Sequence, residues 1–235
     1  MIGRLKLEDF VNMLITVEQW NAVAGNLEGD RTLTEAYRGF TYDEMFGKEE
    51  FLEGYRTGDL VMQADGIADM VYTSFFWSLS FRSFDRVRAA LCRGVRQGYQ
   101  LPVESSTDLD DTVFELVEIL QERFVDISFV REMVVLMIQM QDKLDIRKAF
   151  DKVTTSNFSK YPLVSEIECP EKEIEFITGQ GRYTDVTYKT VGEGEEQRYV
   201  FLAGQDVRDG TVFTKAKIVK PSTFQDVVGM EECIL

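Results

Sequence analysis

Apolar residues recur at helical spacing through most of the first two thirds of the chain. Within residues 7–24 they lie three or four positions apart, which places them on one face of a predicted helix. A longer apolar face predicts a helix from residue 60 to at least Leu79, extending as far as Arg96 if the pattern continues. Further helices are predicted over residues 108–124, 127–143 and 145–156, and residues 97–107 have the composition of a loop.

The segment between the first two long helices is acidic and less regular. Residues 32–40 predict one or two helical turns. Thr41 precedes Glu44 at the spacing of a capping box, in which the first residue of a helix accepts a backbone hydrogen bond. We therefore expect a helix to begin at Thr41 and to run over residues 42–56.

The pattern changes near Pro162. Short runs typical of strands, 184–191 and 197–202, flank Gly192-Glu193-Gly194 and predict a hairpin, and a third strand is expected over 211–219. The fold class is thus mainly α, a helical bundle with a small C-terminal β-hairpin or sheet. We predict an all-α body over residues 1–162 and a small β-rich appendage over 163–235.

Composition and charge narrow the chemistry. The chain has no His, 26 Lys and Arg against 41 Asp and Glu, and a formal net charge of −15. Without His, catalysis by a Ser-His-Asp triad and His-ligated zinc are excluded. Three Cys without a CxxC pair indicate neither a disulfide framework nor a zinc site, which favours a reducing, cytoplasmic location.

The acidic balance and the apolar runs also bear on partners. An acidic chain repels nucleic-acid backbones and anionic membrane surfaces, so we expect no nucleic-acid partner. No apolar stretch has the length of a signal peptide or a membrane-spanning helix, so we expect no membrane association. A polyphosphate substrate remains compatible with the charge, because a bound divalent cation reverses the local field.

Two groups of carboxylates are candidates for such a site. Glu49, Glu50 and Glu53 lie on one predicted helix, where spacings of three and four place Glu53 on the same face as Glu50 and Glu49. Asp65 and Asp69 are four residues apart within an apolar stretch, where two buried carboxylates are unfavourable without a partner. Facing each other, the two groups would supply the oxygen ligands that Mg²⁺ prefers. The alternative is a solvated acidic helix face, which is the commoner meaning of such a charge pattern.

Four motifs, in this order, resemble those of the MazG-like and phosphoribosyl-ATP pyrophosphohydrolase-like family. The first two are the acidic segments Glu49–Glu53 and Asp65–Tyr72, and the third is Val153–Lys160, with Trp20-Asn21 near the start as an aromatic-plus-polar pair. The C-terminal stretch Lys217–Phe224 is similar to the Lys- and Pro-containing tail of the family. Relative to this family, residues 82–144 are a helical insertion and residues 166–214 a β-rich insertion.

Two positions depart from the family pattern. The second acidic motif would have Glu at position 66, where this chain has Gly66, and Asp65 is the neighbouring carboxylate that could replace it. This departure leaves the number of metal ions open. Ala216 stands where the family commonly has Gly.

The resemblance implies a magnesium-dependent nucleoside triphosphate pyrophosphohydrolase that releases a monophosphate and pyrophosphate from a (d)NTP. It implies Mg²⁺, or Mn²⁺, bound by Glu50, Glu53, Asp65 and Asp69. Glu49 joins Glu50 and Glu53 in the catalytic acidic row, either as an outer ligand or as the group that deprotonates the water. The family is common in bacteria and their viruses, and its members assemble, so a homodimer or homotetramer is expected.

The resemblance also implies substrate contacts outside the acidic motifs. Lys160, Lys217 and Lys220 would meet phosphate oxygens, Asn157 would bind phosphate or sugar, and Trp20 with Asn21 would contact the base. Each has a simpler alternative. The lysines are ordinary surface residues, Asn157 ends a helix and Trp20 belongs to the core.

Two alternatives concern the chain as a whole. A non-catalytic helical nucleotide-binding or interaction protein that retains the fold is supported by Gly66. The arginines of residues 82–96 either steer a triphosphate or form a solvated helix face paired with neighbouring acids, and we favour the solvated face.

Overall fold

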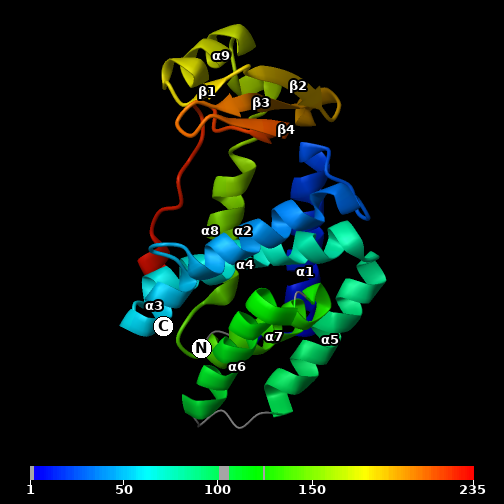
Figure 1. Cartoon of the computed structure of the whole chain (residues 1–235), viewed down its shortest axis with the longest axis vertical. Helices are drawn as coiled ribbons and strands as arrows, with labels where there is room; N and C mark the ends of the chain where they lie inside the picture. Colours follow the sequence, from blue (N-terminus) through cyan, green and yellow to red (C-terminus); the bar gives the residue numbers. More distant parts are fainter. Residues whose placement is uncertain (1–2, 101–105, 124) are drawn as a thin grey trace. The chain divides into compact units, whose positions relative to one another are not determined.

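The computed structural model describes residues 3–100, 106–123 and 125–235, and it is mainly helical with a small antiparallel sheet towards the C-terminus (Figure 1). This confirms the expected mainly α class with a C-terminal sheet. The helices are α1 (Leu7–Ala24), α2 (Thr34–Phe46), α3 (Phe51–Thr57), α4 (Leu60–Phe81), α5 (Phe84–Gln100), α6 (Ser106–Glu118), α7 (Asp126–Met140), α8 (Ile146–Phe158) and α9 (Pro170–Gly179). The strands are β1 (Tyr183–Thr184), β2 (Thr187–Val191), β3 (Arg198–Asp206) and β4 (Thr211–Ile218).

The chain divides into two compact units. The first contains residues 1–21, 26–153 and 228–235, and the second contains residues 22–25 and 154–227. The boundary between them therefore lies inside α8, after Val153, whereas the sequence-based division was placed after residue 162. The last eight residues also belong to the first unit rather than to the appendage.

The core of the first unit is built around α4 and α7. Most of α4 from Ala64 to Ser80 is buried, and α7 is buried on nearly all sides from Phe129 to Met140. Helices that are enclosed by other helices are apolar on most sides, as these two are. α7, which is rich in Met, thus lies in the core of this unit, with α5 packed along it.

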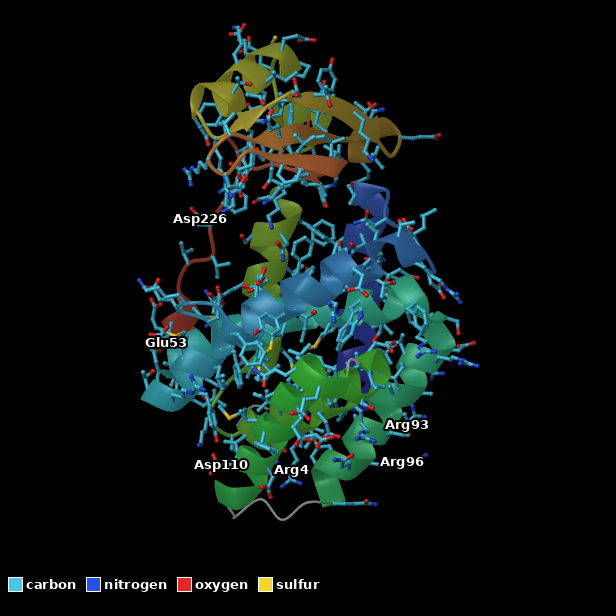
Figure 2. All side chains as sticks on the ribbon, in the orientation of Figure 1. Arg4, Glu53, Arg93, Arg96, Asp110 and Asp226 are labelled. Carbon is cyan, nitrogen blue, oxygen red and sulfur yellow. The ribbon has the colours of Figure 1, made fainter. Side chains whose placement is uncertain are left out.

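The long helix expected after residue 60 ends before the arginines. α4 stops at Phe81, Arg82 is extended, and α5 begins at Phe84. Arg82 pairs with the buried Asp126 at 3.3 Å. Arg93 and Arg96 lie on the exposed face of α5 (Figure 2). Residues 97–100 are helical rather than loop, and residues 101–105 of that expected loop lie outside the described residues.

The expected helix over residues 42–56 is wrong. α2 already begins at Thr34 and ends at Phe46, and α3 begins only at Phe51. Thr41 is therefore inside α2, where its hydroxyl donates to the carbonyl of Tyr37 at 2.8 Å and caps nothing. The spacing of Thr41 and Glu44 imitated a capping box inside a continuing helix.

In the second unit β3 is the central strand. It pairs antiparallel with β1 and β2 along one edge and with β4 along the other. The hairpin expected around Gly192 is confirmed, with Val191 opposite Arg198, and the expected third strand is β4. One face of the sheet packs against α9 through Ile177, Phe201 and Ala203.

The C-terminal residues close the first unit. A 3-10 turn, η5 (Met230–Cys233), buries Met230 and Cys233 against α4. Ile234 forms a bridge with Leu144, and Lys148 pairs with Glu232 at 2.9 Å.

In the described part of the chain, no helix combines the length and apolar character needed to span a lipid bilayer.

Candidate functional site

Five carboxylates from α2, the α2–α3 connection and α4 influence one another in the first unit. Asp43 and Glu44 lie in the last turn of α2, Glu50 directly precedes α3, and Asp65 and Asp69 lie one turn apart on α4. We call this group the acidic cluster. α2 and α4 pack along each other, which brings their acidic residues together.

Glu44 is a strongly perturbed carboxyl group of the acidic cluster. Burial raises the pKa of Glu44 to about 8, with further contributions from the negative charges of Asp69, Glu50, Asp43 and Asp65. A carboxyl group with such a pKa is largely protonated at neutral pH unless a cation compensates the neighbouring charges. Glu44 therefore marks a point where the fold concentrates negative potential.

Glu50 lies in the same field. Burial, together with the negative charges of Asp65, Asp43 and Glu49, raises the pKa of Glu50 to about 7. The negative charge of Asp65 raises the pKa of both Glu44 and Glu50. The α2–α3 connection and α4 thus present their carboxylates to the same region.

Asp65 supplies an oxygen that the protein leaves unpaired. Its Oδ1 is buried and has no hydrogen-bond partner, and burial raises the pKa of Asp65. An unpaired buried polar atom is rare in folded proteins and calls for a proton, a water or an ion as partner. This oxygen is the observation that fits a cation best.

The turn between α2 and α3 is set by two unusual backbone positions. Gly47 is extended, and its Cα approaches the carbonyl of Asp43 so closely that an added Cβ would lie 2.6 Å from that oxygen. Glu49 has a φ of 66°, in the left-handed region that non-glycine residues rarely occupy. Together they reverse the chain after Glu44 and bring Glu50 to the start of α3.

Glu49, Glu50 and Glu53 therefore do not share a helical face, because α3 begins only after Glu50. Glu53 is exposed on α3 (Figure 2), where its carboxylate accepts a hydrogen bond from the Glu49 amide at 2.8 Å. Glu49 is exposed too and pairs with Lys48 at 3.7 Å. Of the predicted acidic residues, the fold brings together Glu50, Asp65 and Asp69, while Glu53 binds backbone instead.

Gly66 has a structural reason. A Cβ at this position would lie 2.8 Å from the backbone N, Cα and Cβ of Phe51 at the start of α3. Gly54 makes a similar approach from α3 towards Met62 on α4, also at 2.8 Å. The missing Glu at position 66 is thus accounted for by close packing of α3 on α4.

The acidic cluster was only partly found from the sequence. A helix that begins at Thr41 and covers residues 42–56 does not single out Asp43 and Glu44 as site residues. The buried residues Tyr37, Thr41 and Met45 recur four apart along α2. Glu44 is seven residues after Tyr37 and three after Thr41, so the same periodicity could have placed it on the inner face.

The acidic cluster could hold a metal ion only if its carboxylates moved closer together. Within the described residues, no three or more Cys, Asp or Glu side chains form a group that could hold a metal ion as they stand. Like charges repel, so carboxylates without a cation between them stay apart. The unpaired Asp65 oxygen and the raised pKa values of Glu44 and Glu50 fit a hard divalent cation bound by oxygen.

Trp20 and Asn21 have different surroundings. Trp20 is half-buried, and its ring meets Tyr72 edge-on with centroids 5.8 Å apart, one helical turn beyond Asp69. Asn21 is fully buried: its Nδ2 donates to the carbonyl of Val17, and its Oδ1 accepts from Asn26 and Tyr37. Asn21 is thus engaged in the core, whereas the Trp20 ring remains partly accessible.

The other predicted substrate contacts lie in the second unit. Lys160 donates to Asn157 Oδ1 at 2.6 Å, and Asn157 is buried. Lys220 pairs with Asp226 at 3.2 Å and lies 3.9 Å from the Phe224 ring centroid. Lys217 is exposed, with its Nζ 5.5 Å from the Phe213 ring centroid. Contact of these residues with a substrate stays a prediction.

The third and fourth resembling motifs do meet inside the second unit. The amide of Gln225, directly after the Lys217–Phe224 stretch, donates to Ser159 Oγ at 2.9 Å.

Comparison of the chain with protein-family models, with curated proteins and with solved structures found no match in any of the three.

Proposed function

We propose that the chain is a magnesium-dependent pyrophosphohydrolase that cleaves a (d)NTP into a (d)NMP and pyrophosphate. The observation that carries the proposal is the acidic cluster, in which carboxylates from three chain segments share one field and Asp65 Oδ1 is buried without a partner. Such an arrangement is unfavourable on its own and becomes favourable around a divalent cation.

Glu44, Glu50, Asp65 and Asp69 are the residues that would hold Mg²⁺, with Mn²⁺ as the alternative ion. Bound there, the ion would neutralise the triphosphate and lower the pKa of a water molecule. Glu53 is retained as a further ligand only if its side chain leaves the Glu49 amide.

A carboxylate of the protein would accept the proton that the attacking water loses. A general base acts best when its pKa lies near the working pH. The pKa of Glu50 is about 7 in the metal-free protein, so Glu50 would serve as this base only where it does not itself bind the ion. Glu49 is the alternative base named from the sequence, and it is exposed close by.

Trp20 is the part of the predicted base contact that the surroundings favour. An aromatic ring that is half accessible beside a carboxylate-bearing helix can stack on a nucleobase. Asn21 is fully buried, and its amide is bound to Val17, Asn26 and Tyr37 within the core, which disfavours contact with a base. Asn157, Lys160, Lys217 and Lys220 remain proposed contacts for phosphate or sugar.

A helical nucleotide-binding protein without turnover is the competing interpretation. Its support was Gly66 in the second acidic motif. The close approach of Phe51 gives Gly66 a packing role. Gly66 therefore no longer favours loss of activity.

The decisive test is a panel of nucleoside triphosphates incubated with Mg²⁺, with products separated by ion-exchange chromatography. We expect equal amounts of monophosphate and pyrophosphate from at least one nucleotide. Asp65→Asn and Asp69→Asn should each lower turnover by about 10²-fold or more. Asp111→Asn, an equal charge change at an exposed position on α6, should leave turnover unchanged.

Two results together would refute the proposal. One is the absence of pyrophosphate from every nucleotide in the panel. The other is the absence of any Mg²⁺-dependent rise in melting temperature, since a ligand that binds only the native state must stabilise it.

A further inference from the structure

The second unit contains a hollow of about 490 Å³ beside the end of α8. A volume of this size is typical of sites for small organic ligands, which range over roughly 300–1,000 Å³. Its walls come from α8, the first residue of β3 and the tail after β4, and include Thr155, Phe158, Ser159, Arg198, Thr223 and Gln225.

The walls of the hollow are tied together by backbone hydrogen bonds. The amide of Tyr199 donates to the carbonyl of Pro162 at 2.9 Å, and the amide of Val164 donates to that of Gln197 at 2.9 Å. On the other side the Gln225 amide donates to Ser159 Oγ. The hollow is thus formed by the fold and does not depend on the orientation of one side chain.

Arg198 is the cationic group of the hollow. Side chains alternate along a strand, so Arg198 lies on the face of β3 opposite to Phe201 and Ala203, which belong to the core under α9. Its Nη1 donates to the carbonyl of Tyr161 at 2.7 Å, which holds the guanidinium in place. Arg198 forms no ion pair with any carboxylate in the described ranges, although the chain is strongly acidic.

Thr223 adds a second unsatisfied group. Its Oγ1 is buried and has no hydrogen-bond partner. A guanidinium has five N–H donors, and the bond from Arg198 to the Tyr161 carbonyl uses only one of them. The hollow therefore offers donors from two different chain segments.

We propose that this hollow binds a small phosphomonoester, with a nucleoside monophosphate as the ligand that best fits its chemistry. Arg198 would bind the phosphate through its planar fork, and Thr223 would donate to a phosphate oxygen. Phe158 offers a half-buried ring for a flat, apolar group, and Glu166 at the rim can accept a hydrogen bond from a sugar hydroxyl.

The test is calorimetric titration of the full chain in the presence of a chelator, so that no divalent metal contributes. The probes are inorganic phosphate, ribose 5-phosphate, a nucleoside monophosphate and the corresponding nucleoside. Affinity should increase from inorganic phosphate to ribose 5-phosphate and from ribose 5-phosphate to the nucleoside monophosphate. The nucleoside alone should not bind, because the charged contact is missing.

Two variants separate binding from folding. Thr223→Val should lower the affinity for the monophosphate about threefold to tenfold, yet leave thermal stability unchanged or raised, since a buried hydroxyl without a partner is replaced by a methyl group. Arg198→Lys keeps the charge but loses the fork, and it should weaken binding by about tenfold.

Arg208→Gln is the matched control, because Arg208 is an exposed arginine of the same unit outside the hollow. It should bind like the wild type. Because the chelator removes divalent metal, the titration does not depend on whether the chain hydrolyses nucleotides. The inference is overturned if no phosphate binds, if the nucleoside binds as well as its monophosphate, or if Thr223→Val and Arg198→Lys both bind like the wild type.

Discussion

Glu44 combines two effects that act on a single side chain, loss of hydration and repulsion by neighbours. Both raise its pKa, and the same two effects raise that of Glu50. Neither residue can be fully ionised near neutral pH without disturbing the other. This makes the acidic cluster sensitive to pH and to divalent cations.

We expect the metal-free protein to lose stability as the pH rises from about 4.5 to about 8, between the ordinary pKa of a Glu and the raised values of Glu50 and Glu44. In this window the native state binds more protons than the unfolded state, so the free energy of unfolding falls with pH. Melting temperatures measured in buffers of constant ionic strength would show the fall.

Glu44→Gln should flatten that pH profile, whereas the exposed Glu122→Gln should not. Mg²⁺ should stabilise the wild type more strongly at the upper end of the window, because carboxylates bind a metal in their ionised form. A profile that is flat in the wild type would contradict the assigned pKa directions.

Substitution of Glu49 can separate its backbone role in the turn from a role of its carboxylate in the reaction. Its φ of 66° is strained for a residue with a Cβ. Glu49→Gly should therefore raise the free energy of unfolding by about 0.5–1 kcal/mol, measured by urea denaturation. If turnover is lost while stability rises, the Glu49 carboxylate acts in the reaction; if turnover is kept, Glu49 only turns the chain.

Glu49→Val is the opposing variant. A β-branched side chain fits the left-handed conformation poorly, so this change should destabilise the protein and displace Glu50. Stability equal to the wild type in both variants would show that the conformation of Glu49 is not strained.

At the element scale, the contact between α3 and α4 determines where the acidic residues lie. Gly66→Ala would place a Cβ 2.8 Å from the backbone of Phe51, which cannot move as a flexible side-chain end could. We expect a loss of about 1–3 kcal/mol in unfolding free energy, as for overpacked cores.

Gly39→Ala on α2 is the control, because nothing lies within 4 Å of its added Cβ. This change should stabilise the protein by up to about 1 kcal/mol through helix propensity. If both alanine variants gain stability, the packing explanation of Gly66 fails.

The helices with a regular apolar face could be predicted from the sequence, and the break between α2 and α3 could not. α1 matches its expected range because its apolar spacing is unbroken. The chain reversal after Phe46 depends on Gly47 and on Glu49, a residue that rarely adopts its conformation. Sequence periodicity does not reveal that Glu49 adopts a left-handed conformation. It therefore predicts that Glu53 faces Asp65 and Asp69, whereas the structure places Glu44 and Glu50 there.

At the scale of the molecule, the two compact units are interleaved along the sequence. The expected boundary followed the change from helical to strand-like composition near Pro162. The compact units instead divide within α8, because a helix can belong to one core at its start and to another at its end. Composition reports the type of element and not the core to which it belongs.

The return of residues 228–235 to the first unit can be tested by truncation. Removal of these residues would expose the surfaces covered by Met230 and Cys233, which are 5% and 0% exposed. We expect a loss of about 2–5 kcal/mol in the unfolding free energy of the first unit, comparable to large cavities in protein cores. Hydrogen exchange should show faster opening of α4 and α8 near Leu144.

Lys148→Ala and Lys152→Ala are milder variants, since they remove the ion pairs with Glu232 and the hydrogen bonds to the carbonyls of Glu232 and Val228 but leave the buried residues in place. Exposed pairs of this kind contribute little, about 0–1 kcal/mol each. A truncated chain as stable as the wild type would mean that the tail is held weakly in solution.

The interleaving also sets the order of events during synthesis. A ribosome releases residues 22–25 and 154–227 before residues 228–235, so all segments of the second unit have emerged while the first still lacks its final piece. Domains generally fold as their segments become available. The second unit can therefore fold before the first is complete, and α4 keeps an uncovered apolar side until residues 228–235 emerge.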